Sequence, residues 1–256
     1  MLPLQKELNA TIVIASREVL RFFKDWKTSL AFSLMFPVLF LGVLGGSIAQ
    51  NLGVGLGYNY LQFAFLGMVT ATIAMNTMMS VTSLVEDREN DFTQEIFVAP
   101  ISRYSIILGK IIGGSVTSIL QLFAFVIVAL AMAIPIGLPA IGWILLLAPI
   151  ICISGGTLGV LVASIFSSSP KTADKGVIMF VFAQMFLSGA LIPVNKSSGV
   201  LGALAHAMPM TYLIDLLIYS QISMYNPLLD LVIIAAISIA SFVIGTFLFV
   251  RSERNR

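Results

Sequence analysis

The chain has 256 residues, of which 58% are hydrophobic and only 10% are charged, and its formal net charge is +2. Soluble domains carry roughly 25% charged residues, so this chain lacks the polar side chains that a water-exposed surface needs. The composition excludes an ordinary soluble domain and indicates an integral membrane protein. The small net charge gives no support for a nucleic-acid partner, and the single cysteine allows no disulfide within the chain.

Residues 1–28 predict an amphipathic helix. Apolar residues recur at helical spacing between Leu8 and Trp26, whereas Arg17 and Lys24 occupy other faces. We expect this helix to lie in the membrane interface, with its basic groups toward lipid phosphates. The alternative is a helix that packs on a soluble partner.

Residues 29–85 contain two predicted membrane spans. The first covers residues 29–48, which at about 1.5 Å per residue matches the roughly 30 Å of bilayer hydrocarbon, and Pro37 should kink it. Residues 49–60 are rich in Gly and Asn and predict a loop on the outer side. The second span covers residues 61–85.

Residues 104–192 contain three further predicted spans, separated by a turn rich in Pro and Gly and by a polar loop at residues 166–176. The bounds of these spans are 104–133, 141–165 and 177–192. Lys110 lies near the inner end of the first, where its long side chain should reach the membrane surface. The second contains small residues that would let a neighbouring helix approach closely. They are Gly155, Gly156 and Gly159.

Residues 193–226 predict a re-entrant outer hairpin rather than a crossing. The apolar run within them is broken by residues such as His206 and Pro209, which suit a short, bent segment. Residues 227–250 then form the last predicted span, followed by a basic tail.

Six crossings would place both chain ends on the same side of the membrane. With that topology, thirteen of the fourteen basic residues lie on the side of the termini and only Lys196 lies on the other. An excess of Lys and Arg marks the cytoplasmic side. We therefore expect a multi-pass membrane protein with cytoplasmic termini.

Catalytic, metal-binding and cofactor-binding residues are not evident. The only histidine, His206, has no partner at ligand spacing, and the predicted spans carry no Asp or Glu at mid-depth where an ion-driven transporter would need one. The phosphate-loop pattern is also absent, because Gly109-Lys110 is followed by Ile111. An enzyme is thus disfavoured, an ion-driven secondary transporter remains an alternative, and the energy for transport should come from a partner.

Residues 86–103 form a polar island between apolar spans and hold five of the twelve acidic residues. This island and the outer hairpin carry motifs that resemble the membrane subunit of a type-2 ABC exporter, the permease family of bacterial drug, polysaccharide and lipid-linked glycan exporters. Asn90-Asp91 departs from the family pattern, in which many members have a glycine. The matching residues of the island are Glu86-Asp87-Arg88-Glu89, Thr93-Gln94-Glu95, Ala99-Pro100-Ile101-Ser102-Arg103 and Leu108-Gly109-Lys110. Those of the hairpin are Leu187-Ser188-Gly189-Ala190-Leu191-Ile192-Pro193 and Met208-Pro209-Met210-Thr211-Tyr212-Leu213-Ile214-Asp215.

The resemblance implies one all-α transmembrane domain of six spans in the bacterial or archaeal plasma membrane. The domain would have an interfacial N-terminal helix, a cytoplasmic coupling helix and the outer hairpin. It also implies two copies of a cytoplasmic ABC ATPase, which would bind the ATP and Mg, and a second copy of this permease or a paralogous permease. The coupling helix would place phenylalanine anchors and a charged rim in a cleft of the ATPase. The alternative for this segment is a solvated loop. The coupling residues are Glu86, Asp87, Arg88, Glu89, Asp91, Phe92, Glu95 and Phe97.

In the same family the first, second and fifth spans line the transport path at the dimer interface. Methionine and phenylalanine enrich the second and fifth spans here, and flexible thioethers and aromatic rings suit an adaptable apolar surface. They favour a drug-like or lipid-like cargo. A polysaccharide or glycolipid cargo is the alternative for the substrate, and packing against neighbouring helices is the alternative for the Met and Phe stripes. The residues assigned to the path are Phe36, Met75, Asn76, Phe182 and Gln184.

Overall fold

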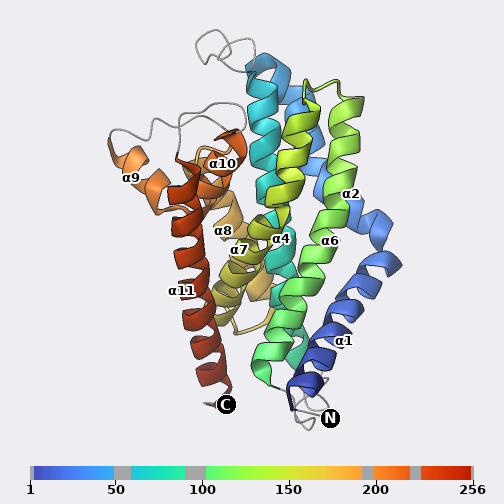
Figure 1. Ribbon diagram of the computed structural model, residues 1–256, viewed down its shortest axis with the longest axis vertical. Helices are drawn as coiled ribbons and strands as arrows, with labels where there is room; N and C mark the ends of the chain where they lie inside the picture. The colour runs from blue at the N-terminus through green and yellow to red at the C-terminus, as the bar shows by residue number, and fades with distance from the viewer. Residues whose placement is uncertain (1–2, 49–58, 90–101, 192–198, 220–225, 255–256) are drawn as a thin grey trace.

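The computed structural model describes residues 3–48, 59–89, 102–191, 199–219 and 226–254, and all of its regular elements in these ranges are helices. The predicted all-α fold is therefore confirmed. The elements are α1 (Pro3–Lys24), α2 (Trp26–Leu39), the π-helical turn η1 (Phe40–Gly45), α4 (Tyr60–Glu89), α6 (Arg103–Ala131), α7 (Leu138–Ile165), α8 (Pro170–Leu187), α9 (Gly199–Ala207), α10 (Pro209–Tyr219) and α11 (Pro227–Arg254) (Figure 1).

Several of these helices are long and apolar enough to cross a membrane, so the chain is a multi-pass membrane protein. Their spans are Trp26–Ile48, Tyr60–Asp87, Arg103–Ala131, Leu138–Ile165 and Pro227–Arg251. The helices α9 and α10 meet at 90°, which fits either a re-entrant hairpin or one broken span. The predicted fifth span, residues 177–192, overlaps α8 only as far as Leu187, and α8, which is 18 residues long, does not belong to this set.

The helix α4 occupies the centre of the bundle. It contacts α6, α7, α8 and α10. In its most apolar segment 72% of the residues are buried within the bundle, compared with 17% in the span that begins at Trp26. The close contact with α7 depends on glycines, since a Cβ on Gly155 or Gly159 would lie 2.8 Å from the Cα of Ala74 or Met78. The expected role of these small residues in close helix approach is confirmed.

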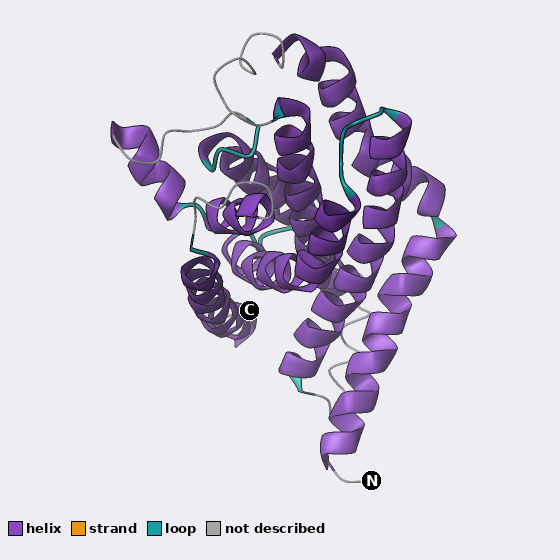
Figure 2. Cartoon of the chain, turned by 45° about the horizontal axis from the view of Figure 1, so that its top comes forward, coloured by secondary structure: helices purple, strands orange, loops and turns teal. Residues whose placement is uncertain are grey.

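The helix α1 packs lengthwise along the beginning of α6 (Figures 1 and 2). Gly109 and Gly113 of α6 make this contact possible, because a Cβ on either would lie less than 3 Å from the side chain of Ile14 or Glu18. The helix expected in residues 1–28 is present over Pro3–Lys24, and its location in the membrane interface remains a prediction. Apolar side chains of α1 point away from the bundle, as lipid contact requires. They are Leu4, Leu8, Ile12, Val13, Leu20 and Phe23.

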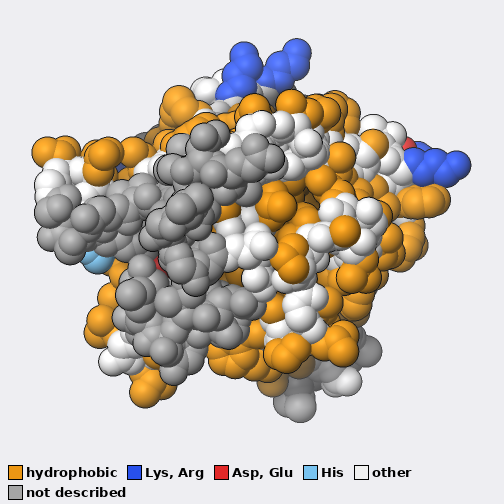
Figure 3. Space-filling model, turned by 90° about the horizontal axis from the view of Figure 1, so that it is seen from above, with side chains coloured by type: hydrophobic (Ala, Val, Ile, Leu, Met, Phe, Trp, Pro, Cys, Tyr) orange, Lys and Arg blue, Asp and Glu red, His pale blue; other side chains and the backbone are white. Residues whose placement is uncertain are grey.

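The outer surface of the bundle is largely apolar. Large hydrophobic side chains are exposed on most of the described helices, α11 among them, and hydrophobic side chains also make up much of the described surface at the end of the bundle seen in Figure 3. Both chain ends lie at the end of the bundle where α4 ends and α6 begins (Figure 1). This common position of the termini agrees with the expected topology, although the side of the membrane on which they lie remains a prediction.

The prediction of a polar loop at residues 166–176 is wrong for residues 170–176, because α8 already begins at Pro170. The Ser169 side chain accepts a hydrogen bond from the Thr172 backbone nitrogen at 3.2 Å and caps the helix. Pro170 follows at the first helical position, where proline needs no hydrogen-bond donor. Capping chemistry therefore outweighs the polar character of this segment.

Candidate functional site

A buried charge network joins α1, α4 and α6. The Lys110 side chain is only 1% exposed, and its Nζ lies 2.6 Å from Glu18 Oε1 and 2.7 Å from Asp87 Oδ2. It also donates a hydrogen bond to Ser83 Oγ at 2.5 Å. The expectation that Lys110 reaches the membrane surface is therefore wrong, because two carboxylates from neighbouring helices replace water around its ammonium group.

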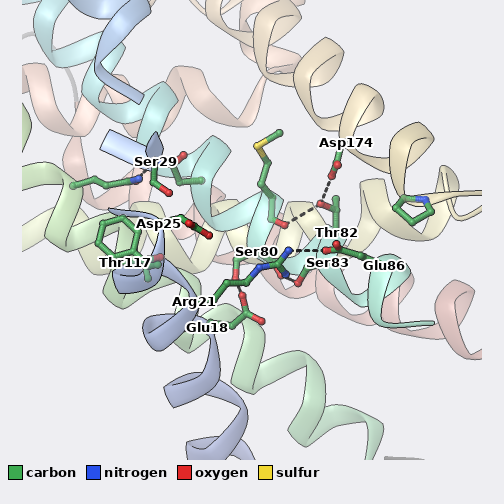
Figure 4. A pocket seen from close by; sticks show the side chains of 15 residues that line it. Glu18, Arg21, Asp25, Ser29, Ser80, Thr82, Ser83, Glu86, Thr117 and Asp174 are labelled. Carbon is green, nitrogen blue, oxygen red and sulfur yellow. Dashed lines mark hydrogen bonds and ion pairs between the residues drawn. The ribbon is translucent and has the colours of Figure 1, made fainter. Parts of the chain in front are cut away.

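Two arginines of α1 extend this network toward the solvent. Arg17 lies 3.0 Å from Asp87, so that Asp87 pairs with both Arg17 and Lys110. Arg21 lies 3.0 Å from Glu86 (Figure 4). The hydrogen bond that Glu86 accepts raises the pKa of the Arg21 guanidinium above its ordinary value, so the guanidinium remains charged.

A second set of contacts holds α1 to the beginning of α6. Glu7 of α1 accepts hydrogen bonds from the Ser102 backbone nitrogen at 3.0 Å and from Ser105 Oγ at 2.5 Å. Residues 90–101 are thus flanked on both sides by residues held to α1. A sequence signal for this arrangement exists, because Glu7 and Glu18 are eleven residues apart, about three helical turns, and share one face of α1.

Of the predicted coupling residues, Glu86 and Asp87 lie in the last turn of α4 and bind α1 and α6 within the chain. Arg88 and Glu89 end the same helix. The coupling role of these residues stays a prediction. The remaining members lie outside the described residues. They are Asp91, Phe92, Glu95 and Phe97.

An apolar cavity of about 430 Å³ lies between α2, α4 and α8. Four of the five residues predicted for the transport path line it, namely Phe36, Met75, Asn76 and Phe182. The rings of Phe36 and Phe182 meet edge to face with centroids 5.7 Å apart. The structure therefore gathers these four residues around one space, and their contact with cargo remains a prediction.

Gln184, the fifth predicted path residue, does not line this cavity. Its side chain is 3% exposed, and its Oε1 accepts a hydrogen bond from the Met210 backbone nitrogen at 3.1 Å, at the break between α9 and α10. A buried amide that satisfies an unpaired backbone donor stabilises the break. The geometry indicates a structural role for Gln184.

A second, polar cavity of about 330 Å³ adjoins the apolar one at the end nearer to the charge network (Figure 4). The two cavities share Ser29, Asn76, Met79 and Gln121 in their linings. At this boundary Asn76 donates a hydrogen bond to Gln121, which in turn donates to Ser33 Oγ at 3.0 Å. The remaining residues of the polar cavity are Glu18, Arg21, Phe22, Asp25, Ser80, Thr82, Ser83, Glu86, Thr117, Pro170 and Asp174.

Comparison with known proteins gives matches over most of the chain. The family model described as "ABC-2 type transporter" matches residues 9–222. A putative transport permease, ycf38, of Cyanophora paradoxa is 28% identical over 191 residues, which are 71% of this chain and 64% of that protein. The inner membrane transport permease YadH of Escherichia coli strain K12 is 26% identical over 102 residues, 40% of each chain. The matched regions therefore span less than two thirds of these relatives.

Proposed function

This chain belongs to the ABC-2 type transporter family, and we propose that it forms the membrane path of an ATP-driven exporter that moves a drug-like or lipid-like amphiphile out of the cell. It is a transport permease, and permeases of this family normally act with an ATPase. The observation that carries the proposal is the pair of adjoining cavities, an apolar one between α2, α4 and α8 and a polar one lined mainly by α1, α4, α6 and α8.

The energy for export would come from two copies of a cytoplasmic ATPase that bind ATP and Mg. Residues 90–101 are the segment proposed to contact this partner. On one side they follow Glu86 and Asp87, which pair with α1, and on the other they precede Ser102, which is bound by Glu7. A displacement of the segment would thus move α1, α4 and α6 together, as a rigid-body transition requires.

The apolar cavity supports an amphiphilic cargo. Phe36 and Phe182 supply aromatic surface, and Met75, Met79 and Met185 supply flexible thioethers that adapt to different shapes. A polysaccharide needs more hydroxyl and amide partners than these side chains offer. The proposed assembly contains a second copy of this permease or a paralogous one, since only 17% of the span that begins at Trp26 is buried within the chain.

The proposal is tested by purifying the chain with its ATPase partner and measuring ATP hydrolysis and dye export in vesicles. The double variant Phe92→Ala/Glu95→Gln removes an anchor and a charge from the proposed coupling segment. We expect export to fall about tenfold and cargo-stimulated hydrolysis to disappear. A tenfold change is about the effect of removing one energetically important residue from a protein interface. A catalytically inactive ATPase is the control for export driven by ATP.

Unchanged export and unchanged stimulated hydrolysis in the double variant would refute the coupling role. Export that continues with the inactive ATPase and stops with an ionophore would show an ion-driven transporter instead.

A further inference from the structure

We propose that the two adjoining cavities together bind an amphiphilic organic cation, with its charged group in the polar cavity and its apolar body between α2 and α8. This inference rests on the proposed function, because it names the chemical class of the cargo. It depends on three features of the cavities, which are their shared boundary, their apolar lining and two carboxylates without an ion pair among the described residues.

The cavities follow one face of α4. The residues of α4 that line them run from Ala71 at the apolar end to Glu86 at the polar end. At about 1.5 Å per residue this stretch is about 22 Å long, enough for an elongated amphiphile. Met79 and the Asn76–Gln121 hydrogen bond lie at the shared boundary, so the lining changes from apolar to polar along this face of α4.

The apolar cavity offers aromatic faces as well as aliphatic surface. Phe32 and Phe36 of α2 lie opposite Phe182 of α8, and Met75 and Met185 line the same space. An apolar body gains free energy from this burial, and the faces of phenyl rings attract a nearby positive charge. This lining suits a cation whose charge is spread over, or attached to, an aromatic group.

Four carboxylates and one guanidinium line the polar cavity. Two of the carboxylates are already paired, since Glu18 lies 2.6 Å from Lys110 and Glu86 lies 3.0 Å from Arg21. The cation of the lining, Arg21, is therefore engaged by Glu86. Because Glu18 and Glu86 are each paired with a cation, the remaining negative charge of the lining comes from the other two carboxylates.

Asp25 and Asp174 are the carboxylates that form no ion pair with any residue that the structure describes. Asp25 precedes α2 and Asp174 belongs to α8, so they approach the cavity from different helices (Figure 4). Asp174 accepts one hydrogen bond, from Thr82 Oγ1 at 2.7 Å. Two carboxylates without an ion-pair partner among the described residues attract a cation and repel an anion of the same shape.

The inference is tested with tetraphenylphosphonium and tetraphenylborate, ions of nearly the same size and shape but opposite charge. The permease is purified with its ATPase partner in lipid nanodiscs, without nucleotide, and labelled with a tetraphenylphosphonium that carries one aryl azide. We expect the photolabel to map to α2, α4 and α8. Unlabelled tetraphenylphosphonium should compete at least about tenfold better than tetraphenylborate, after subtraction of binding to empty nanodiscs.

The variant Asp25→Asn/Asp174→Asn removes both charges without changing side-chain size. We expect it to weaken labelling about tenfold, while its melting temperature stays near that of the unmodified protein. Lys171→Gln is the matched control, because Lys171 is exposed on the same helix as Asp174 and does not line either cavity. It should label normally.

Unchanged labelling in the double variant, or labelling outside both cavities, would overturn the inference. If vesicles export a neutral amphiphile in an ATP-dependent manner while the cation fails to label, the cation inference is overturned and the proposed function stands. If the cation labels the cavities but ATP drives no cargo movement with the partner present, the proposed function is overturned and the cation site stands.

Discussion

Lys110 carries a charge in the interior of the protein, where the loss of hydration costs free energy. An isolated ammonium in a low-dielectric environment loses its hydration, which a single counter-ion restores only in part. Here Glu18 and Asp87 both lie within 2.7 Å of Nζ, and Ser83 accepts a third contact. Two hydrogen bonds, to Glu18 and Ser83, and an ion pair with Asp87 therefore surround the ammonium and join α1, α4 and α6.

Replacing Lys110 by methionine should therefore destabilise the protein strongly. The variant Lys110→Met keeps the approximate length of the side chain but removes its charge. Glu18 then loses the cation with which it pairs, and Asp87 keeps only its ion pair with Arg17. Breaking a buried pair in this way costs about 3–5 kcal/mol. We expect a large drop in melting temperature of the detergent-purified complex, and a smaller drop in Lys110→Met/Glu18→Gln, where one orphaned charge is also removed.

Lys175→Met is the control for this prediction, since Lys175 is exposed on α8 and has no ion pair with the described residues. Its melting temperature should change little. A Lys110→Met protein as stable as this control would show that the network contributes nothing to folding.

At the scale of whole helices, the close packing of α4 against α7 depends on a glycine. A Cβ on Gly155 would lie 2.8 Å from both the Cα and the carbonyl oxygen of Ala74, and these are backbone atoms that a side-chain rotation cannot move. Gly155→Ala should therefore separate the two helices and lower the free energy of unfolding by about 1–3 kcal/mol. Thermal unfolding of the purified protein measures this loss.

Gly142 provides a control on the same helix, because a Cβ there meets no atom within 4 Å. Alanine has the higher helix propensity, so Gly142→Ala should be neutral or stabilising by up to about 1 kcal/mol. Equal effects of the two substitutions would mean that the glycine at 155 acts through helix propensity and not through close packing.

The helices themselves follow from the sequence, because long apolar runs predict them and small residues such as Gly155 predict where they approach. Contacts between distant residues do not follow in the same way. The burial of Lys110 depends on carboxylates 23 and 92 residues away in the sequence, and Gln184 reaches a backbone nitrogen exposed by a helix break. The beginning of α8 was missed for a local reason, since Ser169 and Pro170 initiate a helix in a segment that reads as polar loop.

At the scale of the whole molecule, two parts of the described bundle differ in how firmly they are attached, one of them a group of helices and the other a single helix. The group contains α1, α4 and α6, joined by the Lys110 network, by Glu7 and by the glycine contacts of α6. The loosely attached helix is α2, because little of its span is buried. A movement that opens or closes the apolar cavity should therefore change the distance between α2 and α8, while α1 and α6 keep their contact.

A crosslinking experiment tests this division. Phe36→Cys/Phe182→Cys places thiols on opposite sides of the apolar cavity, where the native rings are 5.7 Å apart, and a bifunctional methanethiosulfonate reagent would join them reversibly. Thr11→Cys/Ser105→Cys is the matched pair across α1 and α6, where Thr11 Oγ1 lies 3.3 Å from the Ser105 carbonyl oxygen. The native Cys152 is buried and should not react.

We expect the crosslink across the cavity to abolish at least about 90% of export and reduction to restore it, because transport requires the two states of a switching element. The crosslink between α1 and α6 should leave export close to its reduced value, since that contact persists in both states. Each variant serves as its own reference, so a loss of cargo affinity from the substitutions does not enter the ratio. Export blocked by the second crosslink and spared by the first would place the moving boundary between α1 and α6 and refute the rigid group.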